Sequence, residues 1–508
     1  MTSPAIPGRA DSVVDADVAD LAVNFSVLTS AGYRLALIAA HHDLADDGHP
    51  AASIRVVYLM VAGPPDTRVE IHVRLPIDDP VLPSLSDVSF TAGRFEREMQ
   101  DLFGIRVTGH HQPARLVLHQ HWPAGWHPMR HDAGPPPSFD NETESYPFLT
   151  VEGPGVYEIP VGPVHAGIIE PGHFRFSVVG ETILNVKARL WFVHKGIERL
   201  FEGRLPDRGV ELAERISGDS AVGHNLTYCL AVEDAAACTP PPEAQLIRAI
   251  LLELERIYNH VTDLGAMGND VGFGIAHAHT MRIREQLLRL NARITGHRLL
   301  RGGVFPGGSR VEWLPDATTL HEIRADVHEI VDIMMANTTV VDRFTGTAVL
   351  AKDDAAQIGT LGYVARASGL DIDARRDHPF IDVHEHLTVP VLPDGDVMTR
   401  FKIRVAEIDC SVELIVGLLR QVHPGDYSSP LNPLDGPRYG VGLVEGWRGT
   451  IAHRIEVDTS GNLSRVKIVD PSFFNWPALP VAIAGDTIVP DFPLANKSFN
   501  LSYAGNDL

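Results

Sequence analysis

The chain has 508 residues, of which 43 are Lys or Arg and 65 are Asp or Glu, so its net charge is −22. This acidity excludes the basic footprint that nucleic acids require. The three cysteines, Cys229, Cys238 and Cys410, exclude a disulfide scaffold and any iron–sulfur cluster held by four cysteines of this chain, and indicate a reducing, cytoplasmic compartment. No run of about 20 apolar residues is present, so we expect membrane contact only through partner proteins.

The N-terminal part of the chain predicts a small mixed domain. Residues 1–20 are polar and rich in Ala and Asp, which favours a flexible tail. Strand patterns lie at 55–62 and 69–75, and a helical pattern covers 90–103. We therefore expect an α+β sandwich over residues 21–132.

A Pro- and Gly-rich segment over 133–161 is expected to link this domain to a second one over 162–508, because such a composition suits neither a helix nor a central strand. A long helix should begin near Thr239, since apolar residues follow it at helical spacing. The second domain is thus expected to be a large, mainly helical bundle with small β elements at both ends. Its other expected elements are strands at 174–179, 182–186 and 450–457 and helices at 205–236, 278–296, 318–338 and 397–422.

Two long motifs resemble subunits of respiratory complex I. The string RFEREMQDLFGI at 94–105, followed by Gly109-His110 and by PMRHD at 128–132, resembles the small hydrophilic (C-type) subunit. The strings HKGIE at 194–198 and RISGDS at 215–220 resemble the large (D-type) subunit, and equally the large subunit of membrane-bound [NiFe] hydrogenases of the formate hydrogenlyase type. The resemblance implies a fusion of the two subunits in this order, with a hydrogenase-large-subunit-like fold in the second domain.

Four positions decide which chemistry the resemblance implies. In the hydrogenases, two pairs of cysteine thiolates hold nickel and iron, because thiolate is a soft ligand that bridges these metals. Here the first pair falls on Ser217 and Ser220, and the second on Ser472 and Asn475. A neutral hydroxyl cannot replace a thiolate on a low-valent nickel ion. We therefore expect no nickel–iron site and no metal bound by this chain.

The quinone signature of complex I is incomplete as well. The family's quinone tyrosine falls on Gly218. His165 fits the first histidine of the family's loop, whereas the second histidine falls near 169–171. His173 closes the Glu170-Pro171-Gly172-His173 string and is included among the candidate site residues. Quinone remains the expected electron acceptor, although the tyrosine and histidine pair that usually hydrogen-bonds it is incomplete.

Three charged residues match functional positions of the family, and each has a structural alternative. Arg215 matches the arginine beside the partner's [4Fe–4S] cluster, where a cation raises the cluster's potential; the alternative is an ordinary salt bridge. Glu170 matches a proton-passing glutamate, or is a solvated loop carboxylate. Asp270 matches the acid at the start of the proton route in complex I, or caps a turn.

Other polar residues have weaker signals. Several fit polar positions of the bundle by resemblance: His194, Glu198, Glu253, Arg256, His260, Asp373 and Arg375. The dense histidines between His110 and His131 raise the question of a zinc site, which needs three or four converging ligands. Because the resemblance explains His110 without metal, we expect none there.

The resemblance as a whole implies a subunit of a membrane-bound, complex I-like oxidoreductase. The chain would form the terminal acceptor cavity against a small [4Fe–4S] subunit, with ferredoxin-like and antiporter-like membrane subunits as further partners, and couple electron transfer to proton movement. It would lie on the cytoplasmic side of the bacterial inner membrane. Two alternatives stay open: the large subunit of a formate hydrogenlyase-type hydrogenase, or a redox-inactive assembly subunit. The sequence does not identify the electron donor among formate, NADH, ferredoxin and CO.

Overall fold

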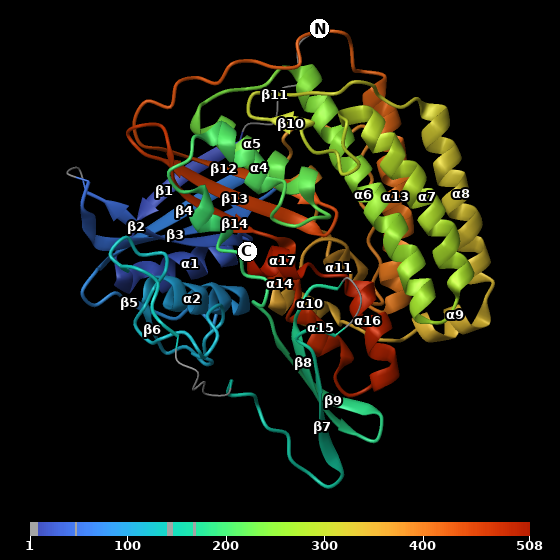
Figure 1. Cartoon of the computed structure of the whole chain (residues 1–508), viewed down its shortest axis with the longest axis horizontal. Helices are drawn as coiled ribbons and strands as arrows, with labels where there is room; N and C mark the ends of the chain where they lie inside the picture. Colours follow the sequence, from blue (N-terminus) through green and yellow to red (C-terminus); the bar gives the residue numbers. More distant parts are fainter. Residues whose placement is uncertain (1–8, 46–47, 140–145, 166–168) are drawn as a thin grey trace.

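The N-terminal domain is built on a mixed four-stranded sheet. The computed structural model describes residues 9–45, 48–139, 146–165 and 169–508. The strand order is β1-β4-β3-β2, with β1 parallel to β4 and the other neighbours antiparallel. The helices α1 (Leu21–Ser30) and α2 (Phe90–Phe103) pack against it (Figure 1). The strands are β1 (Ala10–Asp15), β2 (Arg34–Leu44), β3 (Pro50–Ala62) and β4 (Thr67–Pro76).

The expectation of a flexible tail over 1–20 is wrong for most of its described part. Residues Ala10–Asp15 form β1, which pairs with Thr67–His72 of β4. Backbone hydrogen bonds along this ladder satisfy groups that a tail would leave to water. Residues 1–8 lie outside the described residues.

A second sheet lies beside the first and joins the two domains. It consists of β12 (Arg438–Gly446), β13 (Gly449–Val457) and β14 (Leu463–Val469), all antiparallel. The helix α5 (Ala221–Ala235) packs on its face. This approach needs glycine, because a Cβ on Gly442 would lie 2.0 Å from the carbonyl oxygen of Thr227.

Buried ion pairs connect the domains. Arg454 of β13 donates to Glu70 of β4 at 2.8 Å. Asp66, before β4, accepts hydrogen bonds from His378 at 2.7 Å and from Arg68 at 2.7 Å. Burial alone would raise the pKa of Asp66, but the hydrogen bond from His378 and the charge of Arg68 hold it at about 2. The two domains are therefore tied by charge as well as by apolar packing.

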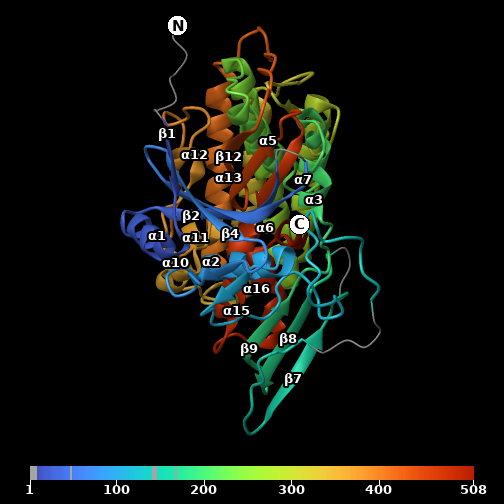
Figure 2. The ribbon, with the colours of Figure 1, turned by 90° about the vertical axis from the view of Figure 1, so that its left-hand side faces the viewer.

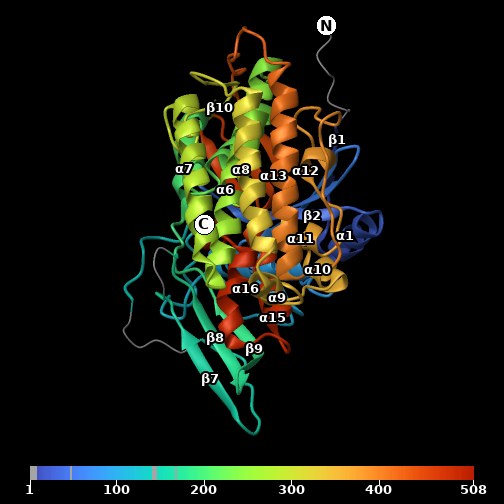
Figure 3. The same ribbon diagram turned by 90° about the vertical axis from the view of Figure 1, so that its right-hand side faces the viewer.

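Four long helices form the bundle on the far side of the second sheet (Figure 3). They are α6 (Pro242–Asp270), α7 (Gly274–Thr295), α8 (Ala317–Met335) and α13 (Val397–Leu419). α6 begins with Pro241 at its N-cap rather than with Thr239, and no side chain caps it. Within the described part of the chain, no helix has the length and apolarity of a membrane span.

The expected helix over 205–236 is interrupted. It consists of a 3-10 turn at Pro206–Gly209, α4 (Val210–Ala213) and α5, with a loop between α4 and α5. A turn at Ser217–Ser220 closes this loop, since the amide of Ser220 donates to the carbonyl of Ser217 at 3.1 Å. The break exposes Arg215 and Gly218.

A three-stranded sheet projects from the body (Figure 1, Figure 2). It contains β7 (Val156–Val161), β8 (His173–Val179) and β9 (Thr182–Arg189). The last six residues of the expected linker over 133–161 thus form the strand β7. β7 tolerates Pro160 because it is an edge strand of this sheet.

Shorter elements surround the centre of the second domain and complete the mixed α+β fold that the sequence predicts. They include α3 (Ile197–Phe201), α11 (Gly362–Ala367), α12 (Ala374–Asp377), α14 (Pro471–Asn475), α15 (Ala478–Ile483), α16 (Phe492–Phe499) and α17 (Tyr503–Asp507).

Candidate functional site

The four positions that the resemblance aligns with the hydrogenase thiolates are all buried. Ser217 and Ser220 lie in the loop before α5, and Ser472 and Asn475 lie on α14. Ser502 connects the two pairs: its hydroxyl lies 2.8 Å from the hydroxyl of Ser217, and its amide donates to the hydroxyl of Ser472 at 2.9 Å. The fold therefore brings both motifs together, as their resemblance implies, and joins them through a residue that the sequence did not single out.

An ion pair closes the site on the side of the first motif. Arg448 donates to both carboxylate oxygens of Asp219, at 2.8 and 2.6 Å, and Ser217 donates to the same carboxylate at 2.8 Å. Burial would raise the pKa of Asp219, but the charge of Arg448 lowers it. Trp447 donates from its indole nitrogen to the hydroxyl of Ser220 at 3.1 Å. The hydroxyl groups of both serines are thus engaged with protein partners.

The segment around α17 binds the surrounding elements together. The amide of Ala504 donates to Glu170 at 2.9 Å, and the carboxylate of Asp507 accepts from the amide of Val193 at 3.1 Å. His194 lies with its Nδ1 2.6 Å from the carbonyl oxygen of Asp507. These contacts span more than 300 residues of sequence, so no local pattern marks them.

Arg215 is exposed beside the buried serines. Its guanidinium donates to the carbonyl of Glu211 at 2.6 Å, and within the described residues it forms no ion pair with a carboxylate. Burial lowers the pKa of the nearby His297, and the charges of Arg301 and Arg215 lower it further. Gly218, three residues from Arg215, has no atom within 4 Å of the position where a Cβ would stand. This face of the site is basic and open.

The loop with His165, Glu170 and His173 approaches the site through the contact between Glu170 and α17. The Nδ1 of His165 is 3.2 Å from the carbonyl oxygen of Pro163, and that of His173 is 3.3 Å from the carbonyl oxygen of Gly162. Glu170 is exposed, and its contact with Ala504 brings it near α17. Residues 166–168 of this loop lie outside the described residues.

Asp270 is not brought to the serines. It is the last residue of α6 and half-buried, and burial raises the pKa of its carboxyl. Asn259 of the same helix donates to the backbone carbonyl of Asp219 at 2.8 Å. Eleven residues of helix, about 16 Å, separate Asn259 from Asp270. Asp270 therefore lies well apart from the site.

A buried charge network extends from the site into the bundle. The ring of His260 lies 5.9 Å from that of Trp447, and its Nε2 is 2.8 Å from Glu407. Glu407 also accepts from Arg366 at 2.6 Å, and Arg366 reaches Glu445 at 2.8 Å. The network joins most of the polar bundle positions expected from the sequence and adds three residues. Its members are Glu253, Arg256, His260, Arg366, Asp373, Arg375, Glu407 and Glu445.

The network holds carboxylates of different acidity. Although burial acts in the opposite direction, the charge of Arg366 and the hydrogen bond from His260 keep the pKa of Glu407 well below its usual value. Burial and the nearby Asp373 raise the pKa of Glu445. Such a pair of environments can store a proton on one carboxyl while the other stays charged.

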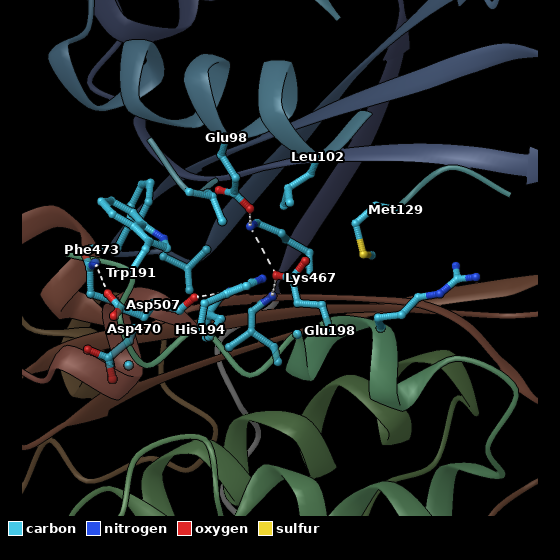
Figure 4. A pocket seen from close by; sticks show the side chains of 18 of the residues that line it. Glu98, Leu102, Met129, Trp191, His194, Glu198, Lys467, Asp470, Phe473 and Asp507 are labelled. Carbon is cyan, nitrogen blue, oxygen red and sulfur yellow. Dashed lines mark hydrogen bonds and ion pairs between the residues drawn. The ribbon is translucent and has the colours of Figure 1, made fainter. Parts of the chain in front are cut away.

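An enclosed cavity of about 70 Å³ lies where the two domains meet (Figure 4). Lys467 of β14 lines the cavity and forms ion pairs with Glu98 of α2 and, at 3.2 Å, with Glu198 of α3. Burial raises the pKa of Glu98 and of Asp507, which also lines the cavity. Neither Gly218 nor Ser472 is among its lining residues.

Three of the histidines between His110 and His131 contact different backbone carbonyls in the described structure. His110 contacts the carbonyl of Gly93 at 2.9 Å, His119 that of Leu190 at 3.0 Å, and His127 that of Asp101 at 3.0 Å. Each imidazole is thus engaged with the backbone at a different place.

One group of potential metal ligands, His41, Asp43 and Glu456, occurs among the described residues. Arg55 already bridges its two carboxylates, at 2.8 and 2.7 Å. A guanidinium therefore supplies the positive charge that a metal would bring.

Comparisons with known proteins agree with the two motifs. The family model "Respiratory-chain NADH dehydrogenase, 30 Kd subunit" matches residues 16–137, and the corresponding 49 Kd subunit model matches residues 270–440. The model "Nickel-dependent hydrogenase" matches residues 195–264.

Two relatives are similar to this chain over most of its length. Formate hydrogenlyase subunit 5 of Escherichia coli is 32% identical over 89% of this chain and 81% of its own length. The fused C/D subunit of the NADH-quinone oxidoreductase of Bacteroides thetaiotaomicron is 28% identical over 80% of this chain and 81% of its own length. A chain of the membrane-bound sulfane sulfur reductase, an archaeal respiratory membrane complex, shares the fold, with a TM-score of 0.65 and 24% identity over 70% of this chain and 99% of that chain.

The expectation drawn from the motifs is confirmed at the level of the family. Three findings support the family that the motifs suggest: the mixed fold, the paired motifs brought together at Ser502, and the extent of the matches. The chain belongs to the family of oxidoreductase subunits that comprises the fused C/D subunits of NADH-quinone oxidoreductases and the large subunits of formate hydrogenlyase-type hydrogenases.

Proposed function

We propose that this chain forms the terminal electron-acceptor side of a complex I-like oxidoreductase and works without a nickel–iron centre. The observation that carries the proposal is that Ser217, Ser220, Ser472 and Asn475 occupy the four thiolate positions, with Ser217 and Ser472 linked through Ser502 and Asn475 bonded to the backbone of Leu361. Hydroxyl and amide groups are hard, neutral donors that do not fit a low-valent nickel–iron pair.

Partner contact would occur at the open, basic face with Arg215 and Gly218. The proposed partner is a small subunit whose [4Fe–4S] cluster lies next to Arg215. A fixed guanidinium favours the reduced, more negative cluster, which raises its reduction potential. Ferredoxin-like and antiporter-like membrane subunits would complete the complex on the cytoplasmic side of a bacterial inner membrane.

The acceptor proposed is a quinone, bound between this face and the partner. Since the family's tyrosine position is Gly218, hydrogen bonding to the quinone would fall to other groups, with His165 the candidate on the neighbouring loop. Glu170 is proposed to pass protons between solvent and the site, because it is exposed at one end and bonded to the amide of Ala504 at the other. The buried network from His260 to Glu445 would then couple charge at the site to the bundle.

The test is Arg215→Met in the purified complex. We expect a lower potential of the partner cluster, measured by redox titration followed by electron paramagnetic resonance, together with slower quinone reduction. Arg289→Met is the matched control, because Arg289 is an exposed helix residue that pairs with Glu285 at 2.8 Å on α7. If both variants leave the potential and the turnover unchanged, the chain is better described as an assembly subunit.

A further inference from the structure

A larger cavity opens between the two domains beside the sheet of β8 and β9. Its volume is about 460 Å³, within the range of small-molecule sites. Its walls come from α2, from residues 110–112, from residues 146–149, from β9 and from the region of Trp476. None of Ser217, Ser220, Ser472 and Asn475 lines it, and the proposed function does not require it.

The charge of this cavity is opposite to that of the chain. Arg94, Arg97, Lys187 and Arg189 line it, together with His110 and His111. Among the described residues its lining contains no Asp or Glu, although the chain as a whole carries a net charge of −22. The described lining therefore gathers cationic side chains on one concave surface, which favours positive potential there.

The arginines of the cavity lack carboxylate partners. Lys187 pairs with Glu158, whereas Arg94, Arg97 and Arg189 form no ion pair within the described residues. Arg97 and Arg189 are only 8% and 5% exposed. Arg97 donates to the carbonyl of Ala114 at 2.6 Å, and Arg189 to that of Leu118 at 3.1 Å. These neutral acceptors position the guanidinium groups but do not neutralise their charge.

Arg94 has the least satisfied guanidinium of the three. One terminal nitrogen donates to Asn506 at 3.2 Å, whereas the buried Nε has no hydrogen-bond partner in the described structure. Burial and the neighbouring charge of Arg97 lower the pKa of Arg94 to about 9, and the charges of Glu98 and Asp507 offset this only in part. A buried donor left without a partner costs about 1–3 kcal/mol, and more when charged, so an added anion would be favourable here.

Aromatic rings stand next to these charges. The guanidinium carbon of Arg189 lies 4.8 Å from the ring centre of Tyr146, and that of Arg94 lies 5.8 Å from the ring of Trp191. Trp476 adds a further ring to the wall. The rings stabilise the cations and form an apolar surface beside them. The site therefore suits a ligand with an anionic end and an apolar or planar body.

We propose that this cavity binds a phosphate ester, with the phosphate held by Arg94, Arg97 and Arg189 and the body of the ligand packed against Tyr146, Trp191 and Trp476. Guanidinium forks match the geometry of phosphate oxygens. A phosphate monoester carries a charge of about −1.5 to −2 at pH 7, which compensates three cations better than one carboxylate does. A soluble metabolite or a phospholipid headgroup would supply the same chemistry.

The test uses the full chain, alone and in its purified complex, with phenyl phosphate as the probe in calorimetric titrations. We expect saturable binding of phenyl phosphate, at least tenfold weaker binding of benzoate, and none of phenol. Arg94→Gln should weaken phenyl phosphate binding by about tenfold to a hundredfold, the cost of a charge-assisted pair. Arg106→Gln is the control, because it removes the same charge from an exposed residue outside the cavity that pairs with Asp79 at 3.0 Å.

Sedimentation with phosphatidylcholine vesicles, with and without phosphatidic acid, distinguishes the two sources of the phosphate. Binding that requires phosphatidic acid and is lost in Arg94→Gln assigns a lipid, and binding of the soluble probe alone assigns a metabolite. If Arg94→Gln does not fold, protection of the α2 and β9 amides from hydrogen exchange by phenyl phosphate decides in the unmodified chain. The proposal is overturned if no phosphate probe binds or protects, if Arg94→Gln binds as well as the unmodified chain, or if only an acidic peptide such as polyglutamate binds.

Discussion

Replacing Arg366 with methionine should destabilise the chain strongly. Arg366 is fully buried and donates to Glu407 at 2.6 and 3.0 Å and to Glu445 at 2.8 Å. Methionine leaves both carboxylates buried without this cation, a change that costs about 3–5 kcal/mol. The entropy of unfolding is about 2.1 cal/mol/K per residue, or about 1.1 kcal/mol/K for 508 residues. The melting temperature should therefore fall by about 3–5 °C.

Thermal unfolding followed by circular dichroism measures this shift. Arg106→Met is the matched control, because Arg106 is exposed and pairs with the exposed Asp79 at 3.0 Å. A surface pair contributes less than about 1 kcal/mol, so the control should melt within about 1 °C of the unmodified chain. Adding Glu407→Gln to Arg366→Met should recover part of the loss, since it removes an uncompensated charge. If Arg366→Met melts with the control, the buried network does not contribute as described.

Three further perturbations test the domain interface and the C-terminal segment. Lys467→Met should lower the free energy of unfolding, measured by urea denaturation, by about 3–5 kcal/mol, because Lys467 pairs with Glu98 across the domains. An unchanged urea midpoint would contradict this. With a pKa of about 2, against about 3.9 when unfolded, Asp66 contributes about 2.6 kcal/mol at neutral pH, which is lost as the pH falls from about 5 through 2. Asp66→Asn should therefore flatten that acid decline, and parallel stability curves would refute the assignment. Ser502→Ala should cost about 1 kcal/mol and speed exchange of the Gly505 amide, which donates to Ser502 at 2.8 Å; unchanged exchange would argue against the cap.

Elements with local signals could be predicted well from the sequence. The helix expected at 90–103 is α2, with the same bounds. Ser89 caps its start by accepting from the amide of Ala92, and Gly104 ends it with a left-handed φ of 74°. Capping chemistry and apolar spacing both lie within the segment, so a reader of the sequence sees them directly.

Elements that depend on distant partners could not be predicted. β1 is exposed along its length and exists because it pairs with β4, which begins 57 residues after β1 does. The break between α4 and α5 follows from the turn at Ser217–Ser220, which the apolar pattern on both sides conceals. In both cases the deciding contact is absent from the local sequence pattern.

The site was only partly predictable for the same reason. Family motifs identified Ser217, Ser220 and Ser472, but the hydroxyl contact between Ser217 and Ser502 spans 285 residues of sequence. Arg448, which pairs with Asp219, lies just before β13 without any motif of its own. The place of such residues in the site is recognised only in the folded structure, where the sheet and α17 bring them against the motifs.

In the proposed function, a chain with a hydrogenase-like fold works without a nickel–iron centre. Metal analysis of the purified complex, combined with a hydrogen-evolution assay, tests it most directly. We expect iron at the level of the partner's clusters, nickel far below one atom per chain, and no hydrogen evolution. One nickel per chain together with hydrogen evolution would contradict the account.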